Sequence, residues 1–251
     1  DVFKRQIHNG AEIMNYNWDW GILFREPYLE WLIDGLGWTV SLSLIAWVIA
    51  FCLGSMLGIM RTSVSPTLRL VGAVYVEIFR NVPLLVQLFL WFFVFPELLP
   101  DDAGMWVKRE MPMPALTTAI IGIGLYTASR VCEQVRSGIE AVGIGQRNAG
   151  RALGMSETKV YINVLLPNAY RIIIPPLTSE FLTIFKNSSL ALTIGVVELT
   201  AMTRQIEEYT FQGFEAFTAA TVIYSVVTFI VMLIMQTIEK YVRVPGRVSV
   251  G

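Results

Sequence analysis

The sequence predicts an all-α integral membrane protein with five membrane-spanning helices. Three observations support this fold class: 54% of the 251 residues are hydrophobic, only 16% are charged, and the hydrophobic residues form long uncharged runs. A soluble domain carries about 25% charged residues, so this chain lacks the polar surface that covers a water-facing globule. The 19 Lys and Arg residues are balanced by 20 Asp and Glu residues, which argues against nucleic acid as a partner.

The first and last spans carry the clearest signal. Residues 36–60 hold no charge, and about 25 residues at about 1.5 Å each exceed the roughly 30 Å of hydrocarbon in a bilayer. Residues 216–238 are also uncharged, and a basic tail over 241–251 follows. Residues 1–35 contain several tryptophans and no apolar core of a cleavable signal, so we expect them to form an N-terminal segment at the outer surface.

Polar residues interrupt the three middle spans. We expect a short interfacial helix from residue 70, a second span over 81–96 and a third over 115–129. A fourth span is expected over 169–185. The following stretch, 186–200, is too polar for a simple helix, and we expect irregular or re-entrant backbone there. Membrane proteins tolerate such backbone where protein or water satisfies its polar groups.

Basic residues beside the spans predict the orientation. The segments 61–69, 134–166 and 240–247 together hold nine Lys and Arg residues, more than the segments that alternate with them. These three segments are therefore expected in the cytoplasm, with the N-terminus outside and the C-terminus inside.

The loop over 143–167 is the most specific segment of the chain, and residues 145–167 read GQRNAGRALGMSETKVYINVLLP. We expect a short helix over 146–153 that ends at a glycine, followed by a second helix capped by a serine. The first helix is polar on one side and small and apolar on the other, a shape that fits a groove in another protein. The alternative is a solvated amphipathic loop. The candidate docking residues are Arg147, Asn148, Ala149, Arg151, Ala152, Gly154 and Ser156.

This loop resembles the coupling motif of the membrane permease subunits of ABC importers, in the branch that takes up polar amino acids. The family motif is Glu-Ala-Ala, three residues, Gly, nine residues and Ile-x-Leu-Pro. Two other segments, EIFRNVPLLVQ (77–87) and KNSSLALTIG (186–195), are similar to the same branch. Within this branch, glutamate/aspartate permeases are the most similar, because the segment TASRVCEQVR (127–136) resembles theirs. The motif positions here are Asn148-Ala149-Gly150, Gly154 and Val164-Leu165-Leu166-Pro167.

The resemblance implies a five-helix permease core over residues 36–240 in the bacterial inner membrane, with a periplasmic N-terminus and the 143–167 loop as coupling helix. The partners it implies are a second homologous permease, two ATPase subunits, a periplasmic amino-acid-binding protein and membrane lipid. The chain lacks a GxxxxGK[ST] loop, so we expect no enzyme activity and no cofactor; ATP and Mg²⁺ belong to the partner ATPase. One histidine and two cysteines are too few for a metal site.

Arg130 is the first candidate for the substrate path. An arginine inside a membrane helix costs about 2.5–3.5 kcal/mol and tends to face a cavity or a partner. Its guanidinium can hold a substrate carboxylate in a bidentate fork. Thr127 and Gln134 lie at helical offsets that share its face. The alternative is a structural ion pair with Glu133, three residues further along the chain.

Polar residues on two other segments complete the candidate path. Lys186, Asn187 and Ser188 supply donors where we expect broken backbone, which is how transporters often build midplane sites. The alternative for these three is a helix end with polar caps. Gln87 either lines the path or makes an interhelical hydrogen bond.

The predicted function is import of glutamate and aspartate, driven by ATP hydrolysis in a partner subunit. The first alternative is a permease for neutral or basic polar amino acids such as glutamine or arginine. For a basic ligand, Arg130 should be paired and Glu133 or Glu180 should face the path. A membrane enzyme or a passive channel is the remaining alternative.

Overall fold

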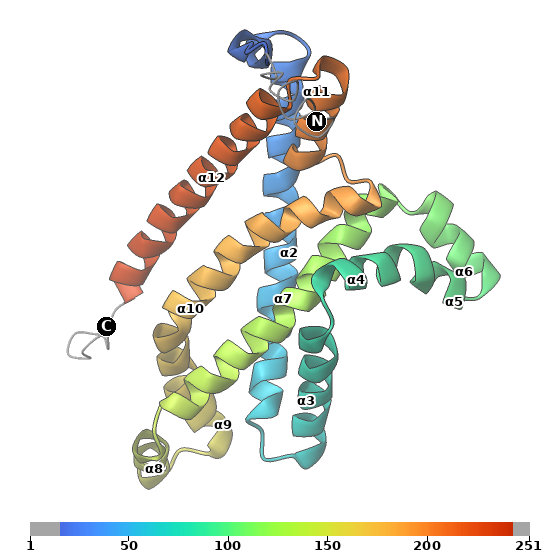
Figure 1. The fold of residues 1–251 in the computed structure, drawn as a ribbon. Helices are drawn as coiled ribbons and strands as arrows, with labels where there is room; N and C mark the ends of the chain where they lie inside the picture. Colours follow the sequence, from blue (N-terminus) through green and yellow to red (C-terminus); the bar gives the residue numbers. More distant parts are fainter. Residues whose placement is uncertain (1–15, 243–251) are drawn as a thin grey trace, which may run out of the picture.

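Two long helices, α2 (Tyr28–Arg61) and α7 (Pro114–Ala141), cross at the centre of the molecule (Figure 1). The computed structural model describes residues 16–242, which form helices and connecting loops. After the short 3₁₀ helix η1 (Trp20–Phe24), the first long helix begins at Tyr28 rather than at residue 36, because Leu32 and Gly35 pack against Leu199 of a later helix. The predicted first span is therefore the middle and end of a longer helix.

Glycines allow α2 and α7 to approach closely. A Cβ added at Gly54 would lie 2.6 Å from the Cβ of Val131, and one added at Gly58 would lie 2.7 Å from the Cβ of Val135. Carbon atoms cannot approach each other that closely, so both positions need glycine at this separation of the helices. The Gly54-x-x-x-Gly58 spacing is a packing motif between α2 and α7.

The second apolar region folds as a sharply bent pair of helices. The first, α3 (Pro66–Asn81), packs against α2 and α7 and lies beside the lower half of α2 (Figure 1). The chain then bends by 101° into α4 (Leu84–Phe89), which continues through the π-helical turn η2 (Leu90–Val94) and α5 (Phe95–Leu98). The predicted second span corresponds to this continuous segment.

The third span is longer than the sequence predicts. After α6 (Asp101–Met105) and the π-helical turn η3 (Trp106–Glu110), α7 continues past residue 129 to Ala141. Arg130 does not end the helix, because the charged residues in the second half of α7 form hydrogen bonds and ion pairs. Glu133 and Glu140 both accept hydrogen bonds from Arg136.

The 143–167 loop leads into the fourth span. It contains α8 (Ile144–Ala152), α9 (Glu157–Val160) and the π-helical turn η4 (Tyr161–Leu165), and α10 (Leu166–Asn187) follows. The fourth span predicted over 169–185 lies entirely within α10.

The chain leaves regular helix after α10, as expected. A 3₁₀ segment, η5 (Ser188–Ile194), ends at Gly195, whose φ of +89° is in the left-handed region. The chain bends by 52° into α11 (Leu199–Thr210), and α12 (Gly213–Val242) completes the described fold. Figure 1 shows α12 running obliquely down from α11 to the C-terminal end of the described chain, and it contacts α10.

The number of spans depends on the two bent segments. Three described helices, α2, α7 and α12, are each long and apolar enough to cross a membrane, and counting each bent pair as one span brings the number to five. Two predicted segments fall outside or largely outside the described residues, namely residues 1–14 and the tail over 241–251.

The glycine packing makes a direct prediction about stability. Gly54→Ala should lower the melting temperature of the purified protein in detergent, because overpacking a close contact costs about 1–3 kcal/mol. Gly37→Ala, on the same helix, is the matched control, since a Cβ added at Gly37 meets no atom within 4 Å. Equal melting temperatures for the two variants would contradict the close packing of α2 on α7.

Candidate functional site

Arg130 lies on α7 opposite Glu180 on α10. Its Nη1 is 3.7 Å from Glu180 Oε1, and its Nη2 donates a hydrogen bond of 3.0 Å to the hydroxyl of Tyr126. The guanidinium carbon is 5.3 Å from the centre of the Tyr126 ring. The pair is unevenly exposed, since 41% of the Arg130 side chain is accessible but only 12% of the Glu180 side chain. A charged donor and a charged acceptor thus face each other between two spans.

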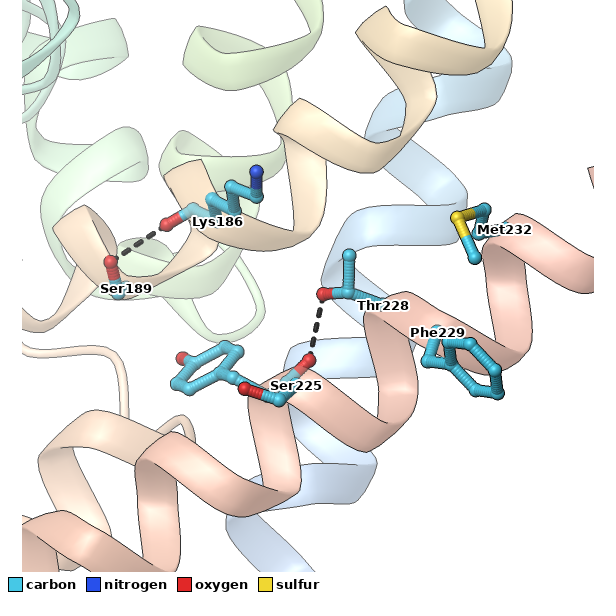
Figure 2. A pocket seen from close by; sticks show the side chains of 7 residues that line it. Lys186, Ser189, Ser225, Thr228, Phe229 and Met232 are labelled. Carbon is cyan, nitrogen blue, oxygen red and sulfur yellow. Dashed lines mark hydrogen bonds between the residues drawn. The ribbon is translucent and has the colours of Figure 1, made fainter.

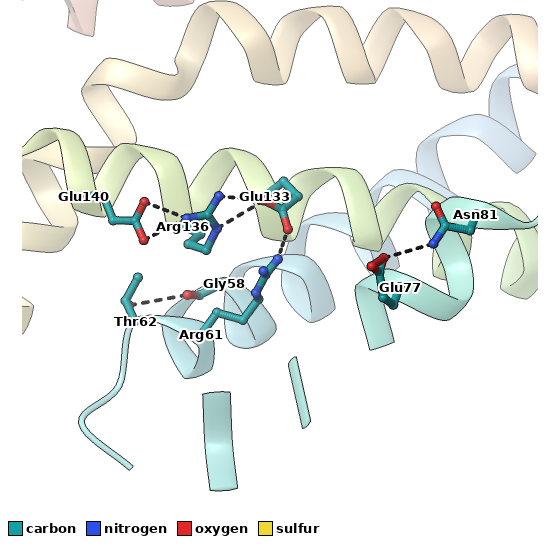
Figure 3. Close-up of polar contacts among 8 residues, drawn as sticks. All are labelled: Gly58, Arg61, Thr62, Glu77, Asn81, Glu133, Arg136 and Glu140. Carbon is teal, nitrogen blue, oxygen red and sulfur yellow. Dashed lines mark hydrogen bonds and ion pairs between the residues drawn. The ribbon is translucent and has the colours of Figure 1, made fainter. Parts of the chain in front are cut away.

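Glu133 is not the partner of Arg130, so the proposed structural ion pair between these two residues is wrong. Figure 3 shows Glu133 contacting Arg61 of α2 and Arg136 of its own helix. The physical reason is that α7 packs between α2 and α10, so different residues of α7 face different helices. Arg61 reaches Glu133 from α2, whereas Arg130 reaches across to α10.

Several polar atoms around Arg130 are buried without a hydrogen-bond partner among the described residues. These atoms are Arg130 Nε, Glu180 Oε2 and, one turn earlier on α7, Thr127 Oγ1. Gln134 is partly buried on the following turn. Buried polar groups are nearly always satisfied in folded proteins, so an unsatisfied donor and acceptor beside one ion pair indicate that a ligand or water completes them.

Gln87 has a structural role in the bend between α3 and α4. Its Nε2 donates hydrogen bonds to the carbonyl oxygens of Phe79, at 2.7 Å, and Val82, at 2.9 Å. These carbonyls lie at the end of α3, where helical partners are missing. The buried side chain therefore stabilises the 101° bend through its amide nitrogen.

Lys186 and Ser188 have different environments although both lie at the end of α10. Ser188 is buried and donates a hydrogen bond of 2.8 Å to the carbonyl of Phe185, so it acts as a polar cap. Lys186 is exposed at a cavity of about 480 Å³ between α10 and α12 (Figure 2). Asn187, between them, is partly buried. Neither Arg130 nor Glu180 lines this cavity.

The predicted path residues therefore lie in three places. Arg130, Thr127 and Gln134 are on α7, Gln87 is at the α3–α4 bend, and Lys186 faces α12. Within this single chain, the structure does not bring the three sets into one pocket.

The 143–167 loop has the shape that the sequence predicts. Helix α8 covers most of the predicted 146–153 helix, and Gly154 follows it with a φ of +76°, a left-handed conformation that favours glycine. Ser156 caps α9 by accepting a hydrogen bond of 3.5 Å from the backbone nitrogen of Lys159.

The arginines of α8 are paired inside the loop. Arg147 donates a hydrogen bond of 2.9 Å to Glu157, and Arg151 contacts the other oxygen of the same carboxylate. Hydrogen bonds from Arg151 and Arg147 hold the pKa of Glu157 below its usual range. Gly150 is buried against Val160, so α8 and α9 form one unit. Exposed residues at the end of α8 and at its C-cap form a surface on which only Arg151 is charged: Asn148, Ala149, Arg151, Ala152 and Leu153.

The family model described as binding-protein-dependent transport system inner membrane component matches residues 29–244 of this chain. The chain belongs to this family of inner-membrane permeases. The match includes every described span and the 143–167 loop.

Two named permeases of one species are among the relatives of this permease. Over 244 residues it is 44% identical to the glutamate/aspartate import permease protein GltJ of Escherichia coli (strain K12), covering 94% of this chain and 99% of that one. The glutamate/aspartate import permease protein GltK of Escherichia coli O6:H1 is 31% identical, with 80% of this chain and 92% of that one covered. The probable amino-acid permease protein YxeN of Bacillus subtilis (strain 168) is 32% identical, with 86% and 93% covered.

Solved structures share the fold of this permease. A chain from the crystal structure of an amino acid ABC transporter with histidines superposes with a TM-score of 0.77 at 29% identity, covering 90% of this chain and all of that one. A chain of the inward-facing MetNI methionine ABC transporter superposes with a TM-score of 0.73 at 19% identity, covering 88% of this chain and all of that one. This second match shows that the two chains share a fold. The predicted fold class, an all-α ABC importer permease, is confirmed.

Glu198 is a polar centre of the permease whose role sequence reasoning missed. Its buried carboxylate accepts hydrogen bonds from the Tyr224 hydroxyl at 2.6 Å, from the Ala201 backbone nitrogen at 2.9 Å and from Thr39 at 3.4 Å. These partners lie on α12, α11 and α2, so one side chain joins three helices. The only sequence signal is a glutamate within an apolar stretch.

The Glu198 cluster predicts the effect of a single hydroxyl on stability. Tyr224→Phe should destabilise the permease by about 1–3 kcal/mol, because a buried carboxylate loses a hydrogen bond that it cannot replace with water. Thermal unfolding in detergent measures the loss. Tyr209→Phe is the matched control, since 68% of Tyr209 is exposed. A melting temperature that Tyr224→Phe leaves unchanged would show that the other two donors are sufficient.

Proposed function

We propose that this chain is a permease subunit of an ATP-driven importer of acidic amino acids, glutamate and aspartate. The observation that carries the proposal is the 44% identity to a glutamate/aspartate import permease along nearly the full length of both chains. The Arg130–Glu180 pair supplies chemistry that suits such a substrate.

The geometry of the pair allows exchange with an acidic amino acid, which has two carboxylates and one ammonium group. At 3.7 Å the Arg130–Glu180 contact is longer than a charge-assisted hydrogen bond of about 2.7–2.9 Å, so it is held loosely. A substrate carboxylate would take the guanidinium of Arg130 in a bidentate fork, and the ammonium would take the free oxygen of Glu180. One substrate carboxylate and the ammonium are then paired, and the second carboxylate, which gives the substrate its net charge of −1, takes a donor outside this pair.

A basic amino acid is the second candidate substrate. Arg130 is already paired, and Glu180 has one unpartnered oxygen that could receive a substrate cation. This arrangement is the one expected for a basic ligand, so the substrate must be tested directly.

The proposed assembly contains a second homologous permease, two ATPase subunits that hold ATP and Mg²⁺, and a periplasmic amino-acid-binding protein. The N-terminus lies in the periplasm and the C-terminus in the cytoplasm. The exposed surface of α8, with Ala149 and Leu153, docks on the ATPase. The pairing of Arg147 and Arg151 with Glu157 supports this surface, because it keeps α8 attached to α9.

The substrate test is ATP-dependent uptake of labelled glutamate in proteoliposomes that contain the chain, its partner permease, the ATPase and the binding protein. Arg130→Gln should lower uptake about tenfold or more, because it removes a charged hydrogen-bonding fork. Arg171→Gln is the control, since Arg171 is an exposed cation on the helix that carries Glu180.

Competition by aspartate, glutamine and arginine separates the alternatives. Uptake of arginine without glutamate would replace the acidic substrate by a basic one. Uptake without ATP would indicate a passive channel. If Arg130→Gln transports glutamate at the unaltered rate, the ion pair has only a structural role.

Docking through α8 makes a separate prediction. Ala149→Trp should lower uptake about tenfold or more while membrane insertion is retained, because a large side chain on the exposed face of α8 blocks the contact with the ATPase. Uptake and ATP hydrolysis are measured on the same proteoliposomes. Thr237→Trp, at an exposed position of α12, controls for the added bulk. Full coupling in Ala149→Trp would contradict docking at this surface.

A further inference from the structure

A cavity of about 340 Å³, lined by both charged and apolar residues, lies where α2 passes into α3 and where α7 passes into α8. Three arginines line it, Arg61, Arg69 and Arg147, and Glu140 is the one carboxylate among the lining residues. The hydroxyls of Thr62 and Tyr161 also line the cavity and hydrogen-bond to each other, which ties the end of α2 to η4. The cavity is separate from the Arg130–Glu180 pair.

The charges around the cavity favour an anion. Glu140 is held by Arg136 through hydrogen bonds of 2.8 and 2.6 Å, so its charge is compensated (Figure 3). Arg61 is paired with Glu133, and Arg147 with Glu157. The charged lining residues and the ion-pair networks that include them together comprise five arginines and three glutamates, a net charge of +2. They are Arg61, Arg69, Arg136, Arg147 and Arg151, and Glu133, Glu140 and Glu157.

Two donors at the cavity are available to a ligand. Arg69 is exposed and forms no ion pair with the residues that the structure describes. Arg147 pairs with Glu157 through Nη2, and its Nη1 forms no hydrogen bond with the residues that the structure describes. A phosphate has enough oxygens to accept from both guanidinium groups.

Exposed apolar residues flank the lining residues along the chain, and we refer to them as the apolar rim. Ile144, itself a lining residue, is 77% exposed, and Val64, in the turn between α2 and α3, is 81% exposed. Leu68 and Leu70, on either side of Arg69, are exposed as well. Exposed apolar side chains beside a basic pocket, where two spans end, match the two halves of a phospholipid. An inorganic phosphate shares the headgroup chemistry but gains nothing from the apolar rim.

We propose that this cavity binds the phosphate of an anionic phospholipid, with Arg69 and Arg147 as the donors and the acyl chains along Val64 and Leu68. Because Arg147 belongs to α8 and Arg69 to α3, the bound lipid bridges the α2–α3 turn and the 143–167 loop. The lipid thus stabilises the position of α8 relative to the spans. This inference does not depend on which amino acid is transported.

The test is lipid binding to the assembled transporter in detergent, followed by native mass spectrometry and by the melting temperature during titration with phosphatidylglycerol. Arg69→Gln should raise the apparent dissociation constant for phosphatidylglycerol about tenfold, the loss expected for one charged contact. Arg69→Lys should retain most of the affinity. Lys159→Gln, which removes an exposed cation that does not line the cavity, should leave the affinity unchanged.

Four outcomes would overturn the proposal. If Arg69→Gln binds phosphatidylglycerol as the unaltered chain does, the cavity does not hold the lipid phosphate. An equal loss in Lys159→Gln would assign the binding to diffuse surface charge. Equal binding of zwitterionic phosphatidylcholine would exclude recognition of anionic charge. Equal stabilisation by inorganic phosphate would make the cavity a site for free phosphate. Glutamate uptake is measured separately, so failure here leaves the proposed transport function untouched.

Discussion

The close approach of α2 and α7 is the constraint on which the rest of the structure depends. Lipid tails are as apolar as leucine side chains, so membrane helices associate through van der Waals packing between small residues rather than through the hydrophobic effect. Gly54 and Gly58 supply these small positions on α2, and Gly124 supplies one on α7, where an added Cβ would lie 3.0 Å from Ile49. Helices α3, α4, α10 and α11 pack against one or both of these helices, whereas α12 packs against α10 and α11.

The crossing also determines which charges on α7 are structural. It brings Arg61 of α2 to Glu133, while Arg136 of α7 pairs with Glu133 and Glu140 within its own helix, so the charges in the second half of α7 are compensated. Arg130 instead faces α10, where Glu180 is further away and both partners keep an unsatisfied atom. The two ion pairs, Arg61–Glu133 and Arg130–Glu180, therefore differ in geometry: the first is a close contact between α2 and α7, and the second is the longer pair that we propose exchanges with the substrate.

Local patterns predicted much of the fold correctly. Uncharged runs located α2 and α12, and the polar residues from 186 onward predicted a departure from regular helix, which the structure shows as a 3₁₀ segment and a bend. The glycine and serine of the 143–167 loop have the predicted conformation and capping role, because both signals act within a few residues. Long-range partners were not predictable: the contact between Glu198 and Thr39 joins residues 159 positions apart, and the hydrogen bonds from Gln87 to the bend depend on how α3 and α4 meet.

The sequence alone determined that this chain is a multi-span membrane protein of the ABC importer permease type, since hydrophobicity, glycine spacing and the coupling motif are properties of consecutive residues. The tertiary structure decided which polar residues face one another. A side chain in a membrane helix has several neighbours within reach, and helix crossing and rotation select among them. That selection separated Arg130 from Glu133 and brought Arg61, Arg69 and Arg147 around one cavity.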